Sequence, residues 1–271
     1  MEIVQLLYGN QNLEFSLPLS PRHEVLLPHA IPDNNLDPVE QVKKALHSPL
    51  CGCNDLERIN SSTRVSISIN DKTRPVPNDL LLGCLLDELH NRGAAESNIT
   101  LFIASGTHLP MQPEEFHLVL DDKFTSRYKI QVHDCDDTGN LVNLGVTKNG
   151  TPVFINQKFY ESDLKIVVGD IELHHFAGYS GGVKSAAIGL AGRTTINTNH
   201  TLLLSQGAIV AEYDANPLRM DIEEIGAMAE VHLALNAVLS EDKKVLYAFF
   251  GHPRDVMRAG IKAVNSISQV P

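Results

Sequence analysis

An eleven-residue segment carries the densest set of chemically active side chains in this sequence. It reads His174-His175-Phe176-Ala177-Gly178-Tyr179-Ser180-Gly181-Gly182-Val183-Lys184, and His200 follows sixteen positions later. Imidazoles can exchange protons near neutral pH or bind a metal ion, and a lysine can act as a point charge or as an amine nucleophile. Gly181 and Gly182 lack a Cβ, so their backbone amides can approach an anion closely. The segment therefore predicts a ligand-binding or catalytic site.

Two other polar segments are expected at the same place. Asp71-Lys72-Thr73-Arg74 follows an alternating strand pattern at Arg64–Asn70, and Gly106-Thr107-His108 follows an apolar run at Ile99–Ala104. The eleven-residue segment itself follows a buried-strand pattern at Leu164–Gly169. If the three strands run parallel in one sheet, their carboxyl ends meet at the edge where open α/β sheets bind ligands. Taken singly, each segment also fits a plainer structure, such as a turn with a local ion pair or a solvated histidine at a helix entry.

Strand and helix patterns alternate along the rest of the chain. Helices are predicted from Asp37-Pro38, where a capping residue precedes a proline, and over Asn78–Arg92, Gln112–Leu120, Met220–Ala229 and Val256–Val264. Further strands are predicted over Tyr128–His133, Asn140–Val146 and Val153–Asn156, followed by a strand pair at Leu233–Leu239 and Val245–Phe250. The expected fold class is α/β, with a largely parallel Rossmann-like sheet flanked by helices and an N-terminal β-rich segment.

Composition narrows the class of protein. The chain has 271 residues, a formal net charge of −11 and 43% hydrophobic residues, with no apolar run long enough for a transmembrane helix. The acidic balance argues against nucleic acid as a partner, and the N-terminus lacks a signal-peptide pattern, so we expect a cytoplasmic protein. The four cysteines, Cys51, Cys53, Cys84 and Cys135, are interpreted as reduced thiols, because Cys51-Gly52-Cys53 has no second pair with which to form a usual structural zinc site.

The motifs together resemble the nickel-dependent lactate racemase family. The resemblance is carried, in order and spacing, by Asp71-Lys72-Thr73-Arg74-Pro75, Gly106-Thr107-His108, the segment 174–184, Asn199-His200 and Ala215-Asn216-Pro217-Leu218, and it spans about Arg64 to Ala263. Three positions depart from the pattern expected of that family: Leu109 and Val183 stand where a basic residue is expected, and His175 stands where an aromatic residue is common.

The resemblance implies a cofactor and a role for each site residue. The cofactor would be a nickel pincer nucleotide, a pyridinium-3-thioamide-5-thiocarboxylate mononucleotide that holds Ni(II), attached covalently to Lys184. His200 would be the protein ligand to nickel, and His108 and His174 would be the acid/base pair. The remaining residues implied at the cofactor are Asp71, Thr73, Arg74, Ser180, Gly181 and Gly182.

The implied activity is racemisation or epimerisation of a 2-hydroxy acid, lactate or a related compound. The α-hydrogen of such an anion is a poor acid, so its removal as a hydride, while a histidine takes the hydroxyl proton, is the easier route. Residues 1–265 would form the cofactor-binding catalytic lobe, and residues 266–271 would begin a linker to a C-terminal lobe. Implied partners are the enzymes that make the pincer nucleotide, and a C-terminal lobe or a homo-oligomer.

Other classes of function remain open at this stage. The first is a lobe that binds the cofactor but has no activity without a second lobe or partner chain. Another is a zinc hydrolase using His174, His175 and His200 with Glu172, although adjacent histidines in an extended segment point to opposite sides. A nucleotide kinase is disfavoured, because the Ser180-Gly181-Gly182 turn lacks phosphate-loop spacing. The segment His133–Asp137 is interpreted as an acidic turn rather than a metal site.

Overall fold

The computed structural model of the chain describes residues 2–8, 11–18, 37–50 and 54–270. By their internal contacts the residues divide into two compact units, one comprising Asp33–Val264 and the other comprising Met1–Pro32 with Asn265–Pro271. In the smaller unit, β1 (Glu2–Tyr8) and β2 (Gln11–Leu17) pair in antiparallel register. The predicted N-terminal β-rich segment is therefore confirmed. Cys51 and Cys53 lie outside the described residues, whereas Cys84 and Cys135 are buried free thiols.

A six-stranded sheet forms the centre of the larger unit. Its order is β12-β11-β8-β3-β4-β5, built from Val245–Gly251, Leu233–Leu239, Leu164–Asp170, Val65–Asn70, Ile99–Ala104 and Lys129–Val132. All neighbouring pairs are parallel except β11 with β12, which is antiparallel. The predicted α/β class with a largely parallel sheet is confirmed.

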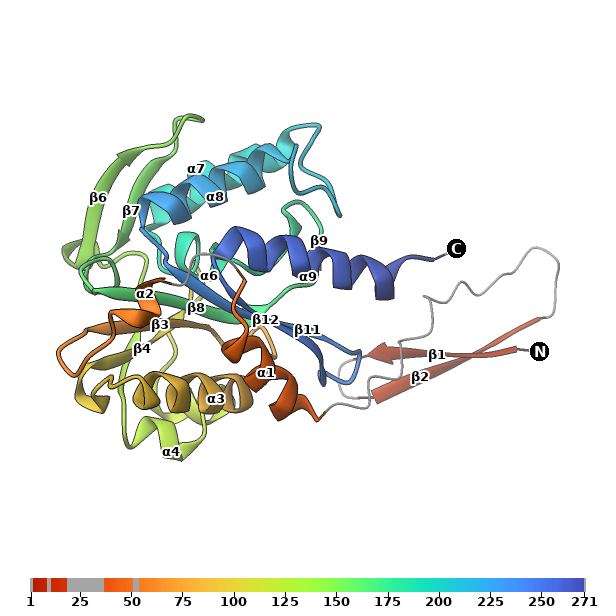
Figure 1. Ribbon diagram of the computed structural model, residues 1–271. Helices are drawn as coiled ribbons and strands as arrows, with labels where there is room; N and C mark the ends of the chain where they lie inside the picture. Colours follow the sequence, from red (N-terminus) through yellow and green to blue (C-terminus); the bar gives the residue numbers. More distant parts are fainter. Residues whose placement is uncertain (1, 9–10, 19–36, 51–53, 271) are drawn as a thin grey trace. The chain divides into compact units, whose positions relative to one another are not determined.

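The alternation of residue types in β3 explains how the two faces of the sheet are covered. Val65, Ile67 and Ile69 point into the main hydrophobic core, which they share with α1 (Pro38–His47) and α3 (Asn78–Asn91). The small Ser68 points to the opposite face, where its hydroxyl donates to the Ser185 carbonyl in α6 at 3.3 Å. Side chains this small let the backbone of α6 lie close to the sheet. Figure 1 shows α1 and α3 on one face and α6, α8 and α9 on the other.

Several further elements complete the fold. They are the helices α2 (Asn54–Glu57), α4 (Asp122–Thr125), α5 (Gln157–Tyr160), α6 (Lys184–Ala187), α7 (Arg193–Thr201), α8 (Pro217–Met228) and α9 (Pro253–Ser268), the hairpin strands β6 (Leu141–Val146) and β7 (Pro152–Asn156), and the short pair β9 (Leu173–His174) and β10 (Gly178–Tyr179). Among the described residues, no helix is both long and apolar enough to cross a membrane.

Two predicted helices differ in detail from those observed. The segment predicted to be helical at Gln112–Leu120 forms a 3-10 helix at Pro113–Leu118, and α9 runs to Ser268, past its expected end at Val264. The proline and the reciprocal cap between Gln112 and Glu115 fix the start of the first of these, but there are too few apolar positions to extend it as an α-helix.

The connections between strands place a crevice beside β3. From β3 the chain continues to β4 and β5 on one side, and from β8 it continues to β11 on the other side. Adjacent strands whose connections leave in opposite directions form a switch point, and ligands of open α/β sheets bind at the carboxyl ends of strands there. The three polar segments follow β3, β4 and β8, so the sheet brings them to one edge.

Candidate functional site

A cavity of about 250 Å³ lies at the carboxyl ends of β3, β4 and β8. The predicted site residues that line it are Asp71, Arg74, His108, His174, Ser180, Gly181, Gly182, Lys184 and His200. Thr73 lies beside it and lines an adjoining cavity that shares Arg74 and His108 with the first. The structure thus brings together residues from segments that are more than a hundred positions apart in the sequence.

His108 is oriented by a buried carboxylate. Asp71, the first residue after β3, is 4% exposed, and its Oδ2 lies 2.7 Å from Nδ1 of His108. Its other oxygen accepts from the Thr73 hydroxyl at 2.6 Å and from the Thr73 amide at 3.1 Å. Because a carboxylate can only accept, the proton of the neutral imidazole lies on Nδ1. His108 therefore offers the lone pair of Nε2, and its half-exposed ring can reach a ligand in the cavity.

His174 is held as a neutral imidazole. Its Nδ1 faces the amide of Ala177 at 3.3 Å, and its Nε2 faces Nη2 of Arg74 at 3.5 Å. Both neighbours are hydrogen-bond donors. A protonated ring, which donates from both of its nitrogens, would therefore face a donor on each side. Burial, followed by the charges of Lys184 and Arg74, lowers the pKa of His174 to about 3. The ring is therefore neutral at neutral pH, but it is only a weak base in this environment.

Phe176 stands between two of the candidate histidines. Its ring meets His174 edge to face at 4.6 Å between centroids and meets His200 at 5.7 Å. Asn216, which is fully buried at the start of α8, donates to the Phe176 carbonyl at 2.9 Å. The Phe176 ring therefore lies against both imidazoles, and the hydrogen bond from Asn216, which does not line the cavity, holds its backbone.

His200 lies in the last turn of α7 and is also neutral. Its Nδ1 is buried without a hydrogen bond in the described structure, and burial followed by the charge of Lys184 lowers its pKa. The carbonyl of Ile196, one turn earlier, is the only group that counteracts this effect. His200 lines the cavity, and a neutral imidazole is the state in which histidine binds a metal ion.

Lys184 begins α6 directly after the glycine turn and has no salt bridge or side-chain hydrogen bond in the part of the chain that the structure describes. Burial, then the nearby guanidiniums of Arg74 and Arg219, lower the pKa of Lys184 to about 7. A lysine with this environment is substantially deprotonated at neutral pH, so its amine can act as a nucleophile.

The glycine turn is clamped from behind by two buried residues that the sequence reasoning missed. Arg219 donates to the carbonyls of Tyr179 and Gly181, and Asn236 accepts from the Gly182 amide at 2.7 Å. Gly181 and Gly182 have φ of +85° and +59°, which disfavour any residue with a Cβ. A lone asparagine in the apolar strand Leu233–Leu239 was the available signal for Asn236. Arg219 is the next residue after the Ala215–Leu218 motif.

Asp170 is a further cavity residue that sequence reasoning missed. It is the last residue of β8 and is 6% exposed, and it lines both adjoining cavities. Burial, then the charge of Glu172, raises its pKa to about 6. Its residue type at a strand end was a visible signal, but no neighbouring motif distinguished it.

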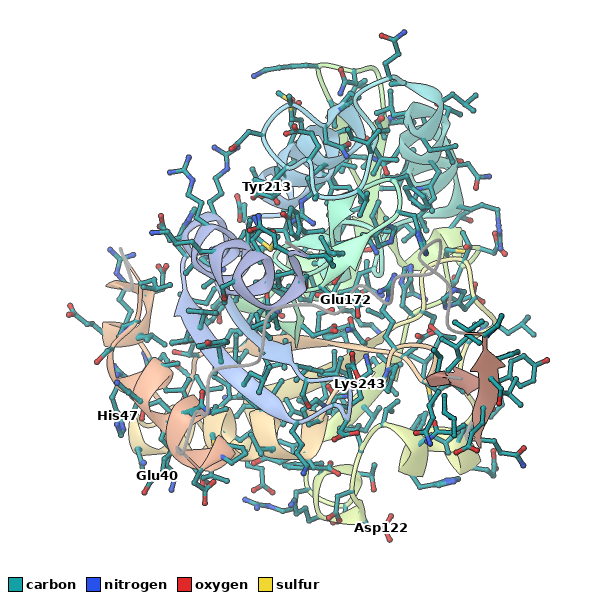
Figure 2. All side chains as sticks on the ribbon, turned by 90° about the vertical axis from the view of Figure 1, so that its right-hand side faces the viewer. Glu40, His47, Asp122, Glu172, Tyr213 and Lys243 are labelled. Atoms are coloured by element: carbon teal, nitrogen blue, oxygen red, sulfur yellow. The ribbon has the colours of Figure 1, made fainter. Side chains whose placement is uncertain are left out.

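Arg74 connects the cavity to the turn between β11 and β12. Its Nη1 lies 3.3 Å from Oε1 of Glu172, and Nζ of Lys243 lies 3.9 Å from the other oxygen of that carboxylate. Figure 2 shows Glu172 and Lys243 near one another on this face. Glu172 contacts Nη1 of the Arg74 guanidinium and His174 faces Nη2, so the remaining N–H groups are those left for an anion.

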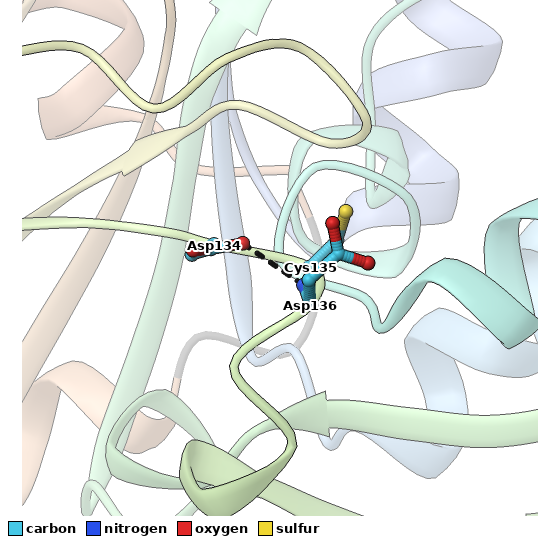
Figure 3. Close-up of side chains that lie close together, drawn as sticks. All are labelled: Asp134, Cys135 and Asp136. Carbon is cyan, nitrogen blue, oxygen red and sulfur yellow. Dashed lines mark hydrogen bonds between the residues drawn. The ribbon is translucent and has the colours of Figure 1, made fainter.

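The arrangement does not support the zinc-hydrolase alternative. Within the described residues, Asp134, Cys135 and Asp136 form the only group of three potential ligands whose atoms converge, so His174, His175 and His200 do not share a metal position. Figure 3 shows that group. There, the Asp136 amide donates to Asp134, and Arg193 binds the Asp136 carboxylate at 2.6 and 2.7 Å. The predicted acidic turn is thus held by protein contacts.

Comparison with known proteins finds relatives of this chain among the lactate racemases. The chain is 32% identical to a lactate racemase of Lactiplantibacillus plantarum over 88% of its own length and 56% of the relative's. It is 29% identical to a lactate racemase of Thermoanaerobacterium thermosaccharolyticum, over its whole length and 64% of the relative's. The chain therefore spans less than two thirds of each of these relatives.

Solved structures of similar proteins share the fold of this chain. The structure of the lactate racemase apoprotein from T. thermosaccharolyticum superposes with a TM-score of 0.90, covering 99% of this chain and 63% of that one. A crystal structure of a Thermotoga maritima protein, 23% identical, superposes with a TM-score of 0.68 and shares the fold. The family model for the lactate racemase N-terminal domain matches residues 8–211. The chain therefore belongs to the lactate racemase N-terminal domain family.

Proposed function

We propose that this chain is the cofactor-binding lobe of a racemase or epimerase that acts on a 2-hydroxy acid, lactate or a related compound. The observation that carries the proposal is the meeting of a nucleophilic lysine, Lys184, with three imidazoles, His108, His174 and His200, around one cavity. Membership of the lactate racemase N-terminal domain family supports the same class.

The residues fit a nickel pincer nucleotide. Lys184 is partly accessible from the cavity and has a lowered pKa, as formation of a covalent amide-type bond requires. His200 presents a neutral ring at the cavity wall, which suits a single protein ligand to Ni(II). Ser180, Gly181 and Gly182 line the same cavity, where Arg74 supplies positive charge for an anionic group. The chemistry that this cofactor supplies when bound is an electrophilic carbon that takes the α-hydrogen with its electron pair.

The chain's own residues would then handle charge and protons. The guanidinium of Arg74 binds the substrate carboxylate through the N–H groups that are not directed at Glu172 and His174. His108, held by Asp71, takes the hydroxyl proton of one enantiomer at Nε2. His174 serves the other enantiomer. The planar 2-keto acid can be reduced on either face, and the histidine on that face returns the proton, which inverts the centre.

Loss of the Lys184 charge on attachment would also adjust His174. The Lys184 ammonium is the largest electrostatic cause of the low pKa of His174 after burial. A lysine nitrogen in a neutral covalent link carries no charge, so the pKa of His174 would rise toward the range useful for proton transfer. The loaded state is therefore expected to be the better catalyst of proton exchange.

A second candidate is a lobe that binds the cofactor without turning over alone. The observation that favours it is that the chain spans 56% and 64% of its two lactate racemase relatives. In this case residues 1–265 form the cofactor-binding lobe, and catalysis needs a C-terminal lobe or partner chain to exclude water.

The test is the intact-protein mass after co-expression with nickel and the pincer biosynthetic enzymes. Wild type and the control Lys72→Ala, an exposed lysine on the loop after β3, are expected to gain the mass of the cofactor, and Lys184→Ala is not. The T. thermosaccharolyticum lactate racemase serves as a positive control for loading. An adduct on Lys184→Ala, or none on folded wild type while the control enzyme loads, would refute the proposal. Activity of the loaded chain on both lactate enantiomers then separates the two candidates.

A further inference from the structure

A second, larger cavity lies between α8 and α9, outside the site described above. Its volume is about 550 Å³, against about 250 Å³ for the candidate site, and the two share no lining residue. It is lined by Lys148, Asn149, Tyr213, Asp214, Met220, Glu223, Glu224, Ala227, Arg254 and Arg258. This volume lies within the range of small-molecule sites in proteins.

One wall of the cavity carries cations that have no protein partner. Arg254 and Arg258 lie one turn apart on α9 and so project from the same face of the helix. Neither guanidinium, nor the ammonium of Lys148 on the opposite rim, forms a salt bridge within the described part of the chain. Three exposed cations without a salt bridge therefore surround one cavity, in a chain whose net charge is −11.

The carboxylates of the cavity are largely engaged. Glu223 binds Arg219 through both Nε and Nη2, and Glu224 accepts from the backbone amide of Lys148 at 3.1 Å. Asp214 is the remaining acidic side chain. Because a hydrogen bond from an amide leaves the Glu224 charge in place, the three cations exceed the carboxylates that lack a cationic partner by one. The adjacent guanidiniums of Arg254 and Arg258 suit a ligand with more than one anionic group.

Tyr213 adds a polar group that also lacks a partner. Its hydroxyl is buried with no hydrogen bond in the described structure, and burial raises its pKa, so it stays protonated and can donate. Figure 2 places Tyr213 beside α9. A buried donor without an acceptor is unfavourable by about 1–3 kcal/mol. Because this hydroxyl is closed to solvent, an anionic oxygen in the cavity would satisfy it only after the ring turns outward.

A buried arginine separates the two cavities. The Arg219 guanidinium donates toward the candidate site, to the carbonyls of Tyr179 and Gly181. On its other side it stacks on the Tyr213 ring at 5.1 Å and binds Glu223. Tyr213 and Glu223 line the second cavity, and Gly181 lines the first. The Arg219 side chain therefore lies between a ligand in one cavity and a ligand in the other.

We propose that the cavity between α8 and α9 is a second binding site, and that its ligand is a small organic polyanion that carries two or more phosphoryl or carboxylate groups. Arg254 and Arg258 bind the anionic groups, Lys148 closes the opposite rim, and the Tyr213 hydroxyl donates to an oxygen of the ligand. The test needs neither cofactor nor turnover, so its outcome is independent of the proposed function.

The test is calorimetric titration of the chain with pyrophosphate and, separately, with tricarballylate. Wild type is expected to bind at least one of them with one-to-one stoichiometry, and the stronger of the two identifies phosphoryl or carboxylate chemistry. Arg254→Gln/Arg258→Gln is expected to weaken binding by about tenfold or more, and Tyr213→Phe by a smaller factor. Lys262→Gln, an exposed cation of α9 that does not line the cavity, is expected to bind as wild type does.

A fourth variant locates the bound anion. Arg74→Gln/Lys184→Ala removes the cations of the candidate site and is expected to leave the pyrophosphate or tricarballylate affinity unchanged. Binding that is lost in this variant but kept in Arg254→Gln/Arg258→Gln would overturn the proposal, as would the absence of heat from both anions at millimolar concentration. Thermal unfolding of each variant by circular dichroism ensures that a loss of binding is not a loss of fold.

Discussion

At the scale of single residues, the orientation of His108 depends on one carboxylate. Asp71 fixes the proton on Nδ1 of the His108 ring. The amide of Asp71→Asn can present a donor instead, so the ring is expected no longer to be held in that tautomer. Turnover of the loaded enzyme should fall by about 10²–10⁴, with a smaller change in KM. The ¹⁵N shifts of the His108 ring give a readout without the cofactor: wild type should show a neutral ring protonated at Nδ1. An unchanged tautomer in Asp71→Asn would contradict this role.

The buried carboxyl of Asp170 predicts a variant that is more stable than the wild type. Its folded pKa, about 6, lies above the ordinary value of 3.8, so the stability it contributes when protonated is present below pH 3.8 and is lost as pH rises through 6. Asp170→Asn should therefore match wild type near pH 4 and exceed it by about 1–3 kcal/mol at pH 8. Urea unfolding at both pH values measures this, with Asp242→Asn on an exposed turn as control. A gain at pH 8 no larger than at pH 4 would show that Asp170 ionises freely.

The sequence could predict those site residues whose side-chain type and spacing together indicate a particular chemistry. His108 and His174 are recognisable because they follow apolar strands, Lys184 because it follows a glycine turn, and His200 through the family resemblance. Arg219 and Asn236 are not, since they act on backbone carbonyls and amides of the turn, and those contacts exist only once α8 and β11 pack behind it. The sequence therefore indicates the side chains that line the cavity better than the residues that support them.

At the scale of elements, the turn between β9 and β10 depends on Gly178. Its φ is +72°, and a Cβ there would lie 1.7 Å from the Glu212 carbonyl oxygen. Gly150 is a matched control, because its φ is +84° and a Cβ would have no atom within 4 Å. Gly150→Ala should lower the unfolding free energy by about 1–2 kcal/mol, and Gly178→Ala by about 3 kcal/mol or more beyond that. Equal losses in urea unfolding would mean that the Glu212 loop moves aside freely.

The start of α8 couples helix formation to the candidate site. Asn216 caps the helix by accepting from the Arg219 amide at 3.0 Å, and its amide group holds the Phe176 carbonyl. Asn216→Ala should destabilise the protein by about 2–4 kcal/mol, since a cap and a buried hydrogen bond are both lost. The matched control is Asp37→Ala, which removes only the cap of α1 and should lower stability by about 1 kcal/mol. If both variants lose the same amount, the bond to Phe176 contributes nothing to stability.

Element prediction succeeded where a pattern was long and failed where it was short. The alternation in β3 and the Asp37-Pro38 cap of α1 specify those elements locally, and both are observed. The 3-10 helix at Pro113–Leu118 was predicted as an α-helix, because a few apolar residues after a proline do not distinguish the two. The pairing order of the sheet arises from tertiary packing, and the alternation of strands and helices indicates only its class.

At the scale of the whole molecule, the main core belongs to one unit. The principal cluster of buried apolar residues runs from Val42 to Phe250, within Asp33–Val264. In the other unit, β1 and β2 form a two-stranded sheet of their own, with Ile3, Leu6 and Tyr8 exposed. A ribbon of two strands is marginally stable in water by itself.

Deletion of residues 1–32 is therefore expected to change the unfolding free energy of Asp33–Val264 by less than about 1 kcal/mol. Native-state hydrogen exchange of the intact chain should show β1 and β2 amides exchanging far faster than those of β3, β4 and β8, because only the latter need global unfolding to open. Deletion of residues 1–47, which also removes α1 from the core, is the contrasting variant and should unfold the chain. If loss of residues 1–32 alone is as damaging, the ribbon is a structural part of the lobe, and its exposed apolar residues contribute to stability in solution.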